Sequence, residues 1–409
     1  MILGCTQTAP RCSRAETDGA TGRPPNETSH ETPRHGSVAA SAIGASGLSN
    51  LVSAQSVEAA ASQPAVIYGP KPGVAKLNAN ENPFGPSPAA LEAIATASAQ
   101  GGAYYAYPAA MTLLDMIAER HGITRKHISL SAGSSPILSY AAVAASKNGK
   151  ILGPDLFWDT TSKAPEKQGA PEIMRIANTA ELDIDLDAMY AAIDDSIGMV
   201  HICNPNNPTG KVLAPNKLRD FCIKASKKTL VLVDEAYNEL IDEPPKHTMI
   251  PLVKAGHNVI VARTFSKIYG LAGMRVGYLI ASEENTEWIN RYGMGGYTLN
   301  QAGLAAAIAS YNDDAFLTFS KEKIYEGKAM VMDAVKAYGL TALPSSTNFI
   351  FVNLGDGNAE YFRQAMAEKD VLIRGIYRTY HNWSRVSKGK IADVKRYVDA
   401  MPAALDKMY

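Results

Sequence analysis

The chain has 409 residues, with 40 acidic and 40 basic side chains, and 46% of its residues are hydrophobic. A chain of this length can bury a large core, and its balanced charge excludes a general electrostatic affinity for nucleic acid or membrane surfaces. No run of about 18 apolar residues predicts a membrane span, and Cys5, Cys12, Cys203 and Cys222 lack metal-ligand spacing, so no metal site is expected.

The first 62 residues differ in composition from the rest. Residues 1–35 are rich in Thr, Pro, Arg, Ser and Glu, a composition typical of disorder. Residues 34–61 resemble a degenerate twin-arginine export signal, with Arg34-His35 in place of the arginine pair and an A-x-A-like cleavage site at 59–61. The alternatives are a flexible extension or a misplaced start codon, so the protein is expected to be either cytoplasmic or exported to the periplasm.

After residue 63 the pattern is that of an α/β protein. Continuous apolar runs, typical of strands buried on both faces of a parallel sheet, occur at 149–154, 197–205, 228–237, 258–267 and 275–282. The pattern becomes helical from Asn300 to about residue 338, and one more strand, "TNFIFVNL" (347–354), follows before the closing helices.

These runs predict two domains. A large domain, residues 95–310, would hold a mostly parallel sheet flanked by helices. Residues 63–94 would form an N-terminal arm that joins a smaller C-terminal α/β domain, residues 311–409.

The stretch "RTFSKIYGLAGMRVGY" (263–278) places Lys267 after a predicted strand, with Arg275 eight positions later. Open α/β sheets bind ligands at the carboxyl ends of their strands, so we expect Lys267 to point into a crevice. A desolvated lysine near a second cation has a lowered pKa and attacks carbonyl carbons, as Schiff-base chemistry with pyridoxal phosphate requires.

Two further motifs end predicted strands. "NPNNPTG" (204–210) is a proline-locked turn, and "DEAY" (234–237) begins with a carboxylate that needs a partner if it is buried. A pyridinium nitrogen would keep Asp234 charged. Pyridoxal phosphate needs such a carboxylate, donors to its phenolic oxygen, a lysine for its aldehyde and an anion site for its phosphate.

Together with "LNANENPFGPSP" (77–88) and "YAYP" (105–108), these motifs closely resemble the class I/II aminotransferases of pyridoxal-phosphate fold type I, and among them the histidinol-phosphate aminotransferase branch. The resemblance covers about residues 75–400. It implies an enzyme that transfers an amino group between an amino donor, with histidinol phosphate and glutamate as the best match, and a 2-oxo acid.

The resemblance also implies roles for individual residues. Lys267 would form the Schiff base and then act as the base that moves the α-proton. Asp234 would keep the pyridine nitrogen protonated, and Asn207 and Tyr237 would donate to the phenolic oxygen. The phosphate ligands would be Gly133, Ser134, Ser135, Thr264, Ser266 and Arg275.

Two aromatic residues complete the implied cofactor site. Trp158, rather than Phe157, matches the ring that stacks on the cofactor. Tyr107 matches a tyrosine that reaches the phosphate of the neighbouring subunit, which implies a homodimer with shared active sites.

For the substrate, Arg385 matches the arginine that binds the carboxylate or its equivalent, and Arg374 resembles a second anion-binding arginine. Three departures bear on histidinol phosphate itself: Asn353 stands where some members have an arginine, "VSKGK" replaces "VSIGT", and Pro136 replaces an acidic residue. Lys388 is a candidate for the replacement charge.

Other functions use the same fold and lysine. One is an aromatic or broad-range amino-acid aminotransferase. Others are a decarboxylase such as threonine-phosphate decarboxylase, an amino-acid oxidase, and a cofactor-binding protein without turnover, against which the intact Lys267, Asp234 and Arg275 argue.

Overall fold

The computed structural model of the protein describes residues 68–102, 104 and 106–409. The predicted leader and export signal, residues 1–62, therefore lie outside the described residues. Within the described ranges, none of the helices has the length and apolar character that a membrane span requires.

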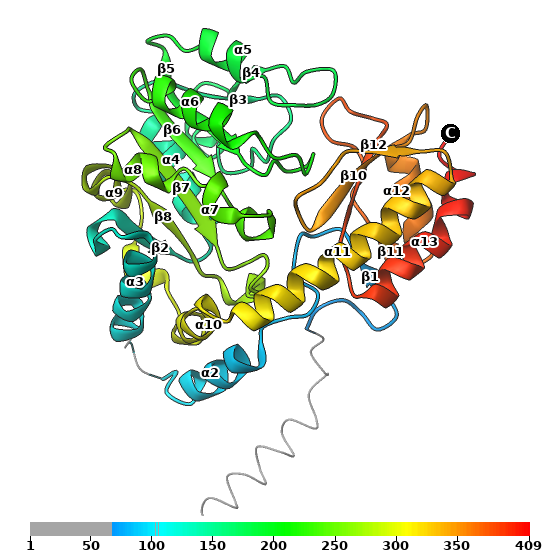
Figure 1. Ribbon diagram of the computed structural model, residues 1–409, viewed down its shortest axis with the longest axis horizontal. Coiled ribbons are helices and arrows are strands. Elements are labelled where there is room, and N and C mark those ends of the chain that lie inside the picture. The colour runs from blue at the N-terminus through cyan, green and yellow to red at the C-terminus, as the bar shows by residue number, and fades with distance from the viewer. Residues whose placement is uncertain (1–67, 103, 105) are drawn as a thin grey trace, which may run out of the picture. The chain divides into compact units, whose positions relative to one another are not determined.

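A seven-stranded sheet in the order β2-β8-β7-β6-β5-β3-β4 forms the centre of the larger part (Figure 1). Its strands are β2 (Ile128–Ser131), β3 (Lys150–Pro154), β4 (Met174–Ile176), β5 (Ile197–Cys203), β6 (Leu230–Asp234), β7 (Val259–Thr264) and β8 (Gly277–Ile280). The predicted, mostly parallel sheet is thus confirmed. The apolar run at 275–282 is the exception, because β8 pairs antiparallel with both of its neighbours.

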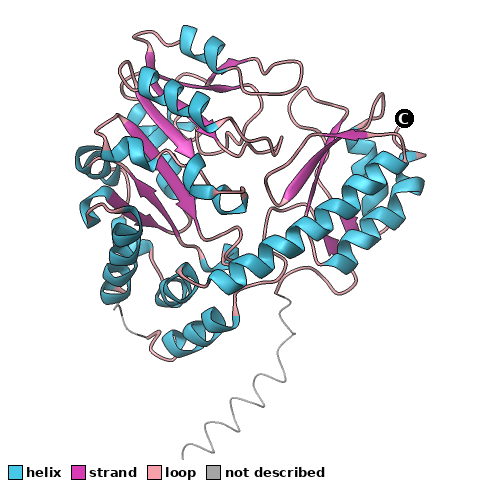
Figure 2. Ribbon diagram, viewed as in Figure 1, coloured by secondary structure: helices cyan, strands magenta, loops and turns pink. Residues whose placement is uncertain are grey.

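The strands are apolar throughout because both faces of the sheet are covered by helices (Figure 2). In β6, Val231 and Val233 pack into one core, whereas Leu230 and Leu232 pack into the core on the opposite face. The first core includes residues of α3 (Tyr107–His121), α6 (Pro215–Ala225), α8 (Ile250–Lys254) and α10 (Gln301–Tyr311). The second includes residues of α4 (Ser134–Ala145) and α9 (Glu283–Asn290).

A smaller group of strands and helices lies toward the C-terminus. Its strands are β9 (Thr341–Ala342), β10 (Phe349–Asn353) and β12 (Trp383–Ser387) in an antiparallel sheet, and β1 (Ala75–Lys76) paired in parallel with β11 (Val371–Leu372). The strand predicted at 347–354 corresponds to β10. Its helices are α11 (Asp314–Ala337), α12 (Ala359–Ala367) and α13 (Ile391–Leu405).

The N-terminal arm packs into this smaller group. Leu77 is fully buried in the same core as Val352 and Val394, and β1 pairs with β11. This packing agrees with the predicted association of the arm with the C-terminal residues, although the exact boundaries at 95 and 310 remain predictions.

The remaining elements are short. They are the helices α2 (Pro88–Ser98), α5 (Leu186–Ala191) and α7 (Pro244–His247), and the 3-10 turns η1 (Arg125–His127), η2 (Glu166–Gln168), η3 (Asn238–Leu240), η4 (Ala272–Met274) and η5 (Gly295–Thr298).

One buried ion-pair network ties β6 to β7. The Arg263 guanidinium donates to Glu235 at 2.7 and 3.1 Å and to Glu239 at 3.0 Å. Glu235 also accepts from the Thr248 hydroxyl and the Met249 amide. Because Glu235 is fully buried, its charge is tolerated only with these partners.

We therefore expect Arg263→Leu to lower the free energy of unfolding by about 3–5 kcal/mol, because it leaves a buried carboxylate without a counter-ion. Urea-induced unfolding measures this change. The matched control is Arg291→Leu, which removes an exposed pair with Glu287 and should change stability by less than about 0.5 kcal/mol. Equal losses in the two variants would contradict this account.

Candidate active site

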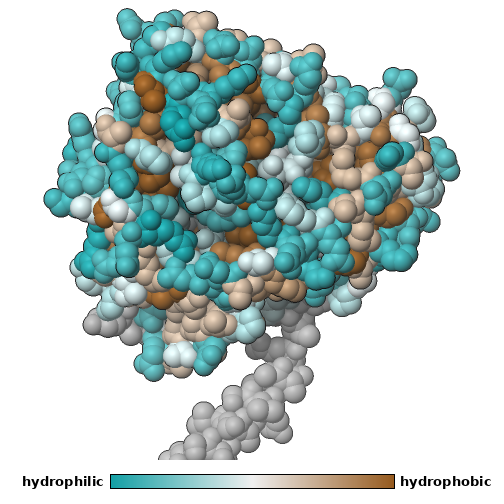
Figure 3. Space-filling view, in the orientation of Figure 1, coloured by the Kyte–Doolittle hydropathy of each residue, from teal (hydrophilic) through white to brown (hydrophobic). Residues whose placement is uncertain are grey.

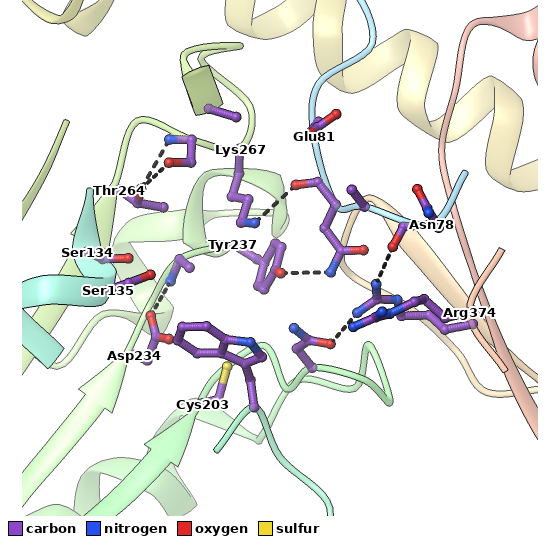
Figure 4. A pocket seen from close by; sticks show the side chains of 18 of the residues that line it. Asn78, Glu81, Ser134, Ser135, Cys203, Asp234, Tyr237, Thr264, Lys267 and Arg374 are labelled. Atoms are coloured by element: carbon purple, nitrogen blue, oxygen red, sulfur yellow. Dashed lines mark hydrogen bonds between the residues drawn. The ribbon is translucent and has the colours of Figure 1, made fainter. Parts of the chain in front are cut away.

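A cavity of about 560 Å³ lies at the carboxyl ends of β5, β6 and β7, between the larger sheet and the C-terminal group (Figure 4). Most of the predicted site residues line it: Ser134, Ser135, Trp158, Asn207, Asp234, Tyr237, Thr264, Ser266, Lys267, Arg275, Arg374 and Arg385. The two exceptions are Gly133, which lies behind the wall, and Tyr107, an exposed residue at the start of α3.

Lys267 lies three residues after β7 and extends into the cavity. Its Nζ donates to the Asn80 carbonyl at 3.1 Å and lies 5.4 Å from the centre of the Tyr237 ring. Burial and, to a smaller extent, the Arg385 charge lower the pKa of Lys267 to about 8, with Asp234 and Glu81 acting in the opposite direction. Near neutral pH a usable fraction of the amine is therefore uncharged and nucleophilic.

Asp234 is the last residue of β6 and lies at the base of the cavity. Its carboxylate accepts the Ala236 amide at 3.1 Å, and no cation pairs with it among the described residues. Burial raises its pKa to about 6, so an added cation in contact with it would stabilise the ionised form. The adjacent Glu235 points to the opposite face of the sheet, toward Arg263.

An anion site is built at the start of α4. Gly133, with a φ of 85°, precedes the helix and gives it no side-chain cap. A Cβ atom on Gly133 would lie 2.1 Å from Nη2 of Arg275, so only glycine allows this approach. Among the described residues, Arg275 donates to three neutral oxygens, those of Ser266, Ala272 and Ala132.

The hydroxyl groups of Thr264 and Ser266 lie 2.9 Å apart beside this guanidinium. Backbone amides at a helix N-terminus, hydroxyls and an arginine without a carboxylate partner are the donors that bind a phosphate group.

The two candidate aromatic residues have different surroundings. Trp158 lines the cavity, whereas Phe157 is buried and packs edge-on against His201, with ring centres 5.2 Å apart. The role of Trp158 as the stacking ring stays a prediction. Ala236 lines the same cavity.

Arg385 is a buried cation with no acidic partner in the part of the chain that the structure describes. It donates to Oδ1 of Asn207 at 2.8 Å and to the Asn78 carbonyl at 3.1 Å. It is 5% exposed, and its Nε has no hydrogen-bond partner among the described residues. Burial lowers the pKa of Arg385, which means that the site favours an anionic ligand that would restore the balance of charge.

Arg374 lies beside it, joined through backbone hydrogen bonds to Arg385. Its guanidinium also lines the cavity. The two arginines thus provide charge for two anionic groups, or for one group with several oxygens.

The departures noted in the sequence lie outside the cavity lining. The side-chain oxygen of Asn353 accepts hydrogen bonds from the Gly355 amide and from the Asn382 side chain. Lys388 is 2% exposed and donates to the Gly327 carbonyl at 3.3 Å, so it does not supply a replacement charge in the cavity. Burial lowers the pKa of Lys388 well below the usual range. Pro136 lies within the first turn of α4.

The structure adds lining residues that sequence reasoning did not assign: Lys76, Asn78, Asn80, Glu81, Cys203 and Tyr377. The first four belong to the arm. Asn78, Asn80 and Glu81 lie in the motif "LNANENPFGPSP", whose dense polar run before a proline was the available signal, whereas Lys76 comes directly before it. Cys203 lies beside Asp234 in the register of β5 and β6. Tyr377 had no comparable sequence signal.

One polar contact joins the loop before Trp158 to the loop between Arg374 and Arg385. The Asp155 carboxylate accepts from Nε of Arg378 and from the Tyr380 hydroxyl, each at 3.1 Å. Leu156 and Phe351 pack together beside this contact. The loops that carry the aromatic ring and the arginines are therefore held together.

The lowered pKa of Lys267 is directly testable by NMR. After reductive methylation with ¹³C-formaldehyde, with Lys267→Arg used to assign the signal, we expect a titration midpoint of about 8. The amine is protonated below this pH and neutral above it. Arg385→Met should raise the midpoint, because it removes a nearby positive charge. A midpoint near the ordinary lysine value of about 10.4 would contradict the burial argument.

The family described as aminotransferase class I and II matches residues 72–401. The protein named histidinol-phosphate aminotransferase 1 of Cupriavidus pinatubonensis is 34% identical over 341 residues, covering 81% of this chain and 89% of the relative. The histidinol-phosphate aminotransferase of Akkermansia muciniphila is 33% identical over 347 residues, covering 81% and 90% of the two chains.

A solved structure shares the fold. The histidinol-phosphate aminotransferase of Sinorhizobium meliloti, in complex with pyridoxal-5'-phosphate, superposes with a TM-score of 0.74 at 25% identity, covering 84% of this chain and 96% of that one. This similarity confirms the predicted fold, a parallel sheet flanked by helices with a smaller C-terminal part. The chain belongs to the class I and II aminotransferase family.

Proposed function

We propose that the cavity binds pyridoxal 5'-phosphate and that the protein is an aminotransferase acting on histidinol phosphate. The observation that carries the proposal is the convergence of Lys267, Asp234 and Arg275 on one cavity. The residues fit the cofactor at both ends: an uncapped helix start with Arg275 for its phosphate, and a carboxylate without a cation for its ring nitrogen.

When bound, the cofactor supplies an aldehyde that exchanges amines and a ring that accepts an electron pair. Asp234 would hold its negative charge against the ring nitrogen, and this contact would favour the ionised carboxylate that burial alone disfavours. Tyr237 and Asn207 would orient the ring oxygen. Tyr237 accepts a hydrogen bond from Asn80, and Asn207 accepts one from Arg385.

Lys267 is the proton carrier. Its side chain is half-buried, and its amine is partly neutral near pH 8 and lies 3.1 Å from the Asn80 carbonyl, which orients it in the cavity. A neutral amine in this position can take a proton from the substrate α-carbon and return it elsewhere on the reacting system.

Arg385 and Arg374 support an anionic substrate. The buried Arg385 lacks an acidic partner, and the Arg374 guanidinium makes no ion pair among the described residues. The relatives named for histidinol phosphate point to its phosphate as the anion, and glutamate offers its α-carboxylate to the same arginines. Since Asn353 and Lys388 lie outside the cavity lining, these departures do not weaken the assignment.

The test is a single half-reaction. Holoprotein without an oxo acid is mixed with L-histidinol phosphate, and the visible absorbance of the bound cofactor is followed. We expect rapid loss of this absorbance in the wild type. In Lys267→Ala we expect a rate reduced by at least about 10²-fold, because the proton carrier is absent. Lys395→Ala, on the surface of α13, is the control.

Loss of absorbance with glutamate or an aromatic amino acid, but not with histidinol phosphate, would contradict the substrate and favour the broad-range alternative. Turnover retained in Lys267→Ala would contradict the mechanism.

We also propose that the protein forms a homodimer with shared active sites. Large side chains are exposed in two segments beside β2: Tyr107, 72% exposed, and Met294 and Tyr297, 69% and 93% exposed. On the face shown in Figure 3, by contrast, hydrophobic residues form small separate groups among hydrophilic ones. A second copy would cover these exposed side chains.

Analytical ultracentrifugation should give twice the chain mass of 43.7 kDa. Tyr107→Ala should weaken cofactor binding, measured by equilibrium dialysis, without dissociating the dimer. A monomer with full activity would contradict the shared site.

A further inference from the structure

The arm residues 76–81 form one wall of the cavity, and their backbone is fixed by contacts with three distant segments. Nδ2 of Asn80 donates to the Tyr237 hydroxyl at 2.9 Å. Lys267 donates to the Asn80 carbonyl, and Asn348 donates to the Glu81 carbonyl at 3.1 Å. The side chains of Lys76 and Glu81 are thereby held at the cavity.

Lys76 and Glu81 form an ion pair with each other. Their side chains are 32% and 45% exposed, whereas those of the buried Arg263–Glu235 pair are 8% and 0% exposed. Because water screens and solvates a half-exposed pair, either partner can be exchanged for a ligand group without stranding a buried charge. The pair is therefore suited to recognition rather than to stability.

Of the acidic residues that line the cavity, Glu81 is the one to which the proposed function assigns no role. Asp234 and Glu81 are the acidic residues among those that line it, and Asp234 lies at the base, opposite the proposed ring nitrogen. On the substrate side, Arg374 and Arg385 are placed for anionic groups. Glu81 is thus the charged acceptor that remains for a donor group on the substrate, and it lies close enough to Lys267 for its charge to be felt there.

We propose that this pair distinguishes the two substrates of the reaction: Glu81 accepts the N–H of the imidazole ring of the amino donor, and Lys76 binds the distal carboxylate of the 2-oxo acid or of glutamate. The inference rests on the proposed function. The two half-reactions alternate, so one cavity must recognise a ring donor in one and a carboxylate in the other. The ion pair offers a carboxylate, Glu81, for the ring N–H and an ammonium group, Lys76, for the carboxylate. Each substrate therefore binds the residue of opposite character.

The experiment measures the two half-reactions separately in holoenzyme by stopped-flow absorbance. With L-histidinol phosphate, Glu81→Gln should lower the apparent second-order rate constant by about 10- to 100-fold, the loss expected for a hydrogen bond to a charged group. With glutamate it should change this constant by less than about threefold. Lys76→Met keeps most of the side-chain stem and should give the opposite pattern. Lys395→Met and Asp399→Asn, from an exposed pair on α13, are the matched controls and should change neither.

A second substrate separates recognition from a structural role. L-phenylalaninol phosphate keeps the phosphate and a ring but has no ring N–H, so wild type and Glu81→Gln should react with it at equal rates. Equal losses in both half-reactions, or a loss with both rings, would overturn the proposal. If the wild type itself does not react with histidinol phosphate, the proposed substrate is wrong and the role of Glu81 falls with it, while the role of Lys76 is decided by glutamate alone.

Discussion

The register of three parallel strands determines where the chemistry takes place. Cys203 of β5 lies beside Asp234 of β6, and Asp234 lies beside Ala262 of β7, so the segments that follow these strands emerge at the same edge. Asn207, Tyr237 and Lys267 all belong to such segments. A slip of one residue in β6 would exchange Asp234 with Glu235 and turn the cavity carboxylate toward Arg263. The buried Arg263–Glu235 pair therefore helps to fix the register on which the site depends.

The cavity at this edge concentrates charges that the fold alone does not neutralise. Asp234 and Arg385 are buried and Lys267 is half-buried, and loss of water shifts the pKa of each group in the direction that favours its neutral form. Such groups reduce stability unless a ligand completes their interactions. A cofactor with an anionic phosphate and a basic nitrogen, together with an anionic substrate, supplies the missing partners. Binding and chemistry thus use an electrostatic imbalance that is built into the folded protein.

The sequence predicted the central strands and the residues at their ends, because apolar runs and short motifs are local signals. Lys267 and Asp234 were found in this way. The short strands β1 and β11 were not predicted, since two residues carry no periodicity and their pairing depends on tertiary contacts. Lys388 was considered for the cavity, but packing against Gly327 of α11 buries it elsewhere. Tyr377 lines the cavity because of the path of its loop, and no local sequence pattern predicts that path.

The cavity combines a fixed end with a variable one. Its cofactor end is built from strand ends and the start of α4, which the two large cores hold in place. Its substrate end is built from the arm, which carries the Lys76–Glu81 ion pair, and from two loops joined by the contacts of Asp155 with Arg378 and Tyr380. A change in one of these contacts alters recognition without disturbing the sheet. Relatives that share the lysine, the aspartate and the phosphate site can therefore differ in substrate, and the specificity of this chain must be sought in the arm and in the loop between Arg374 and Arg385.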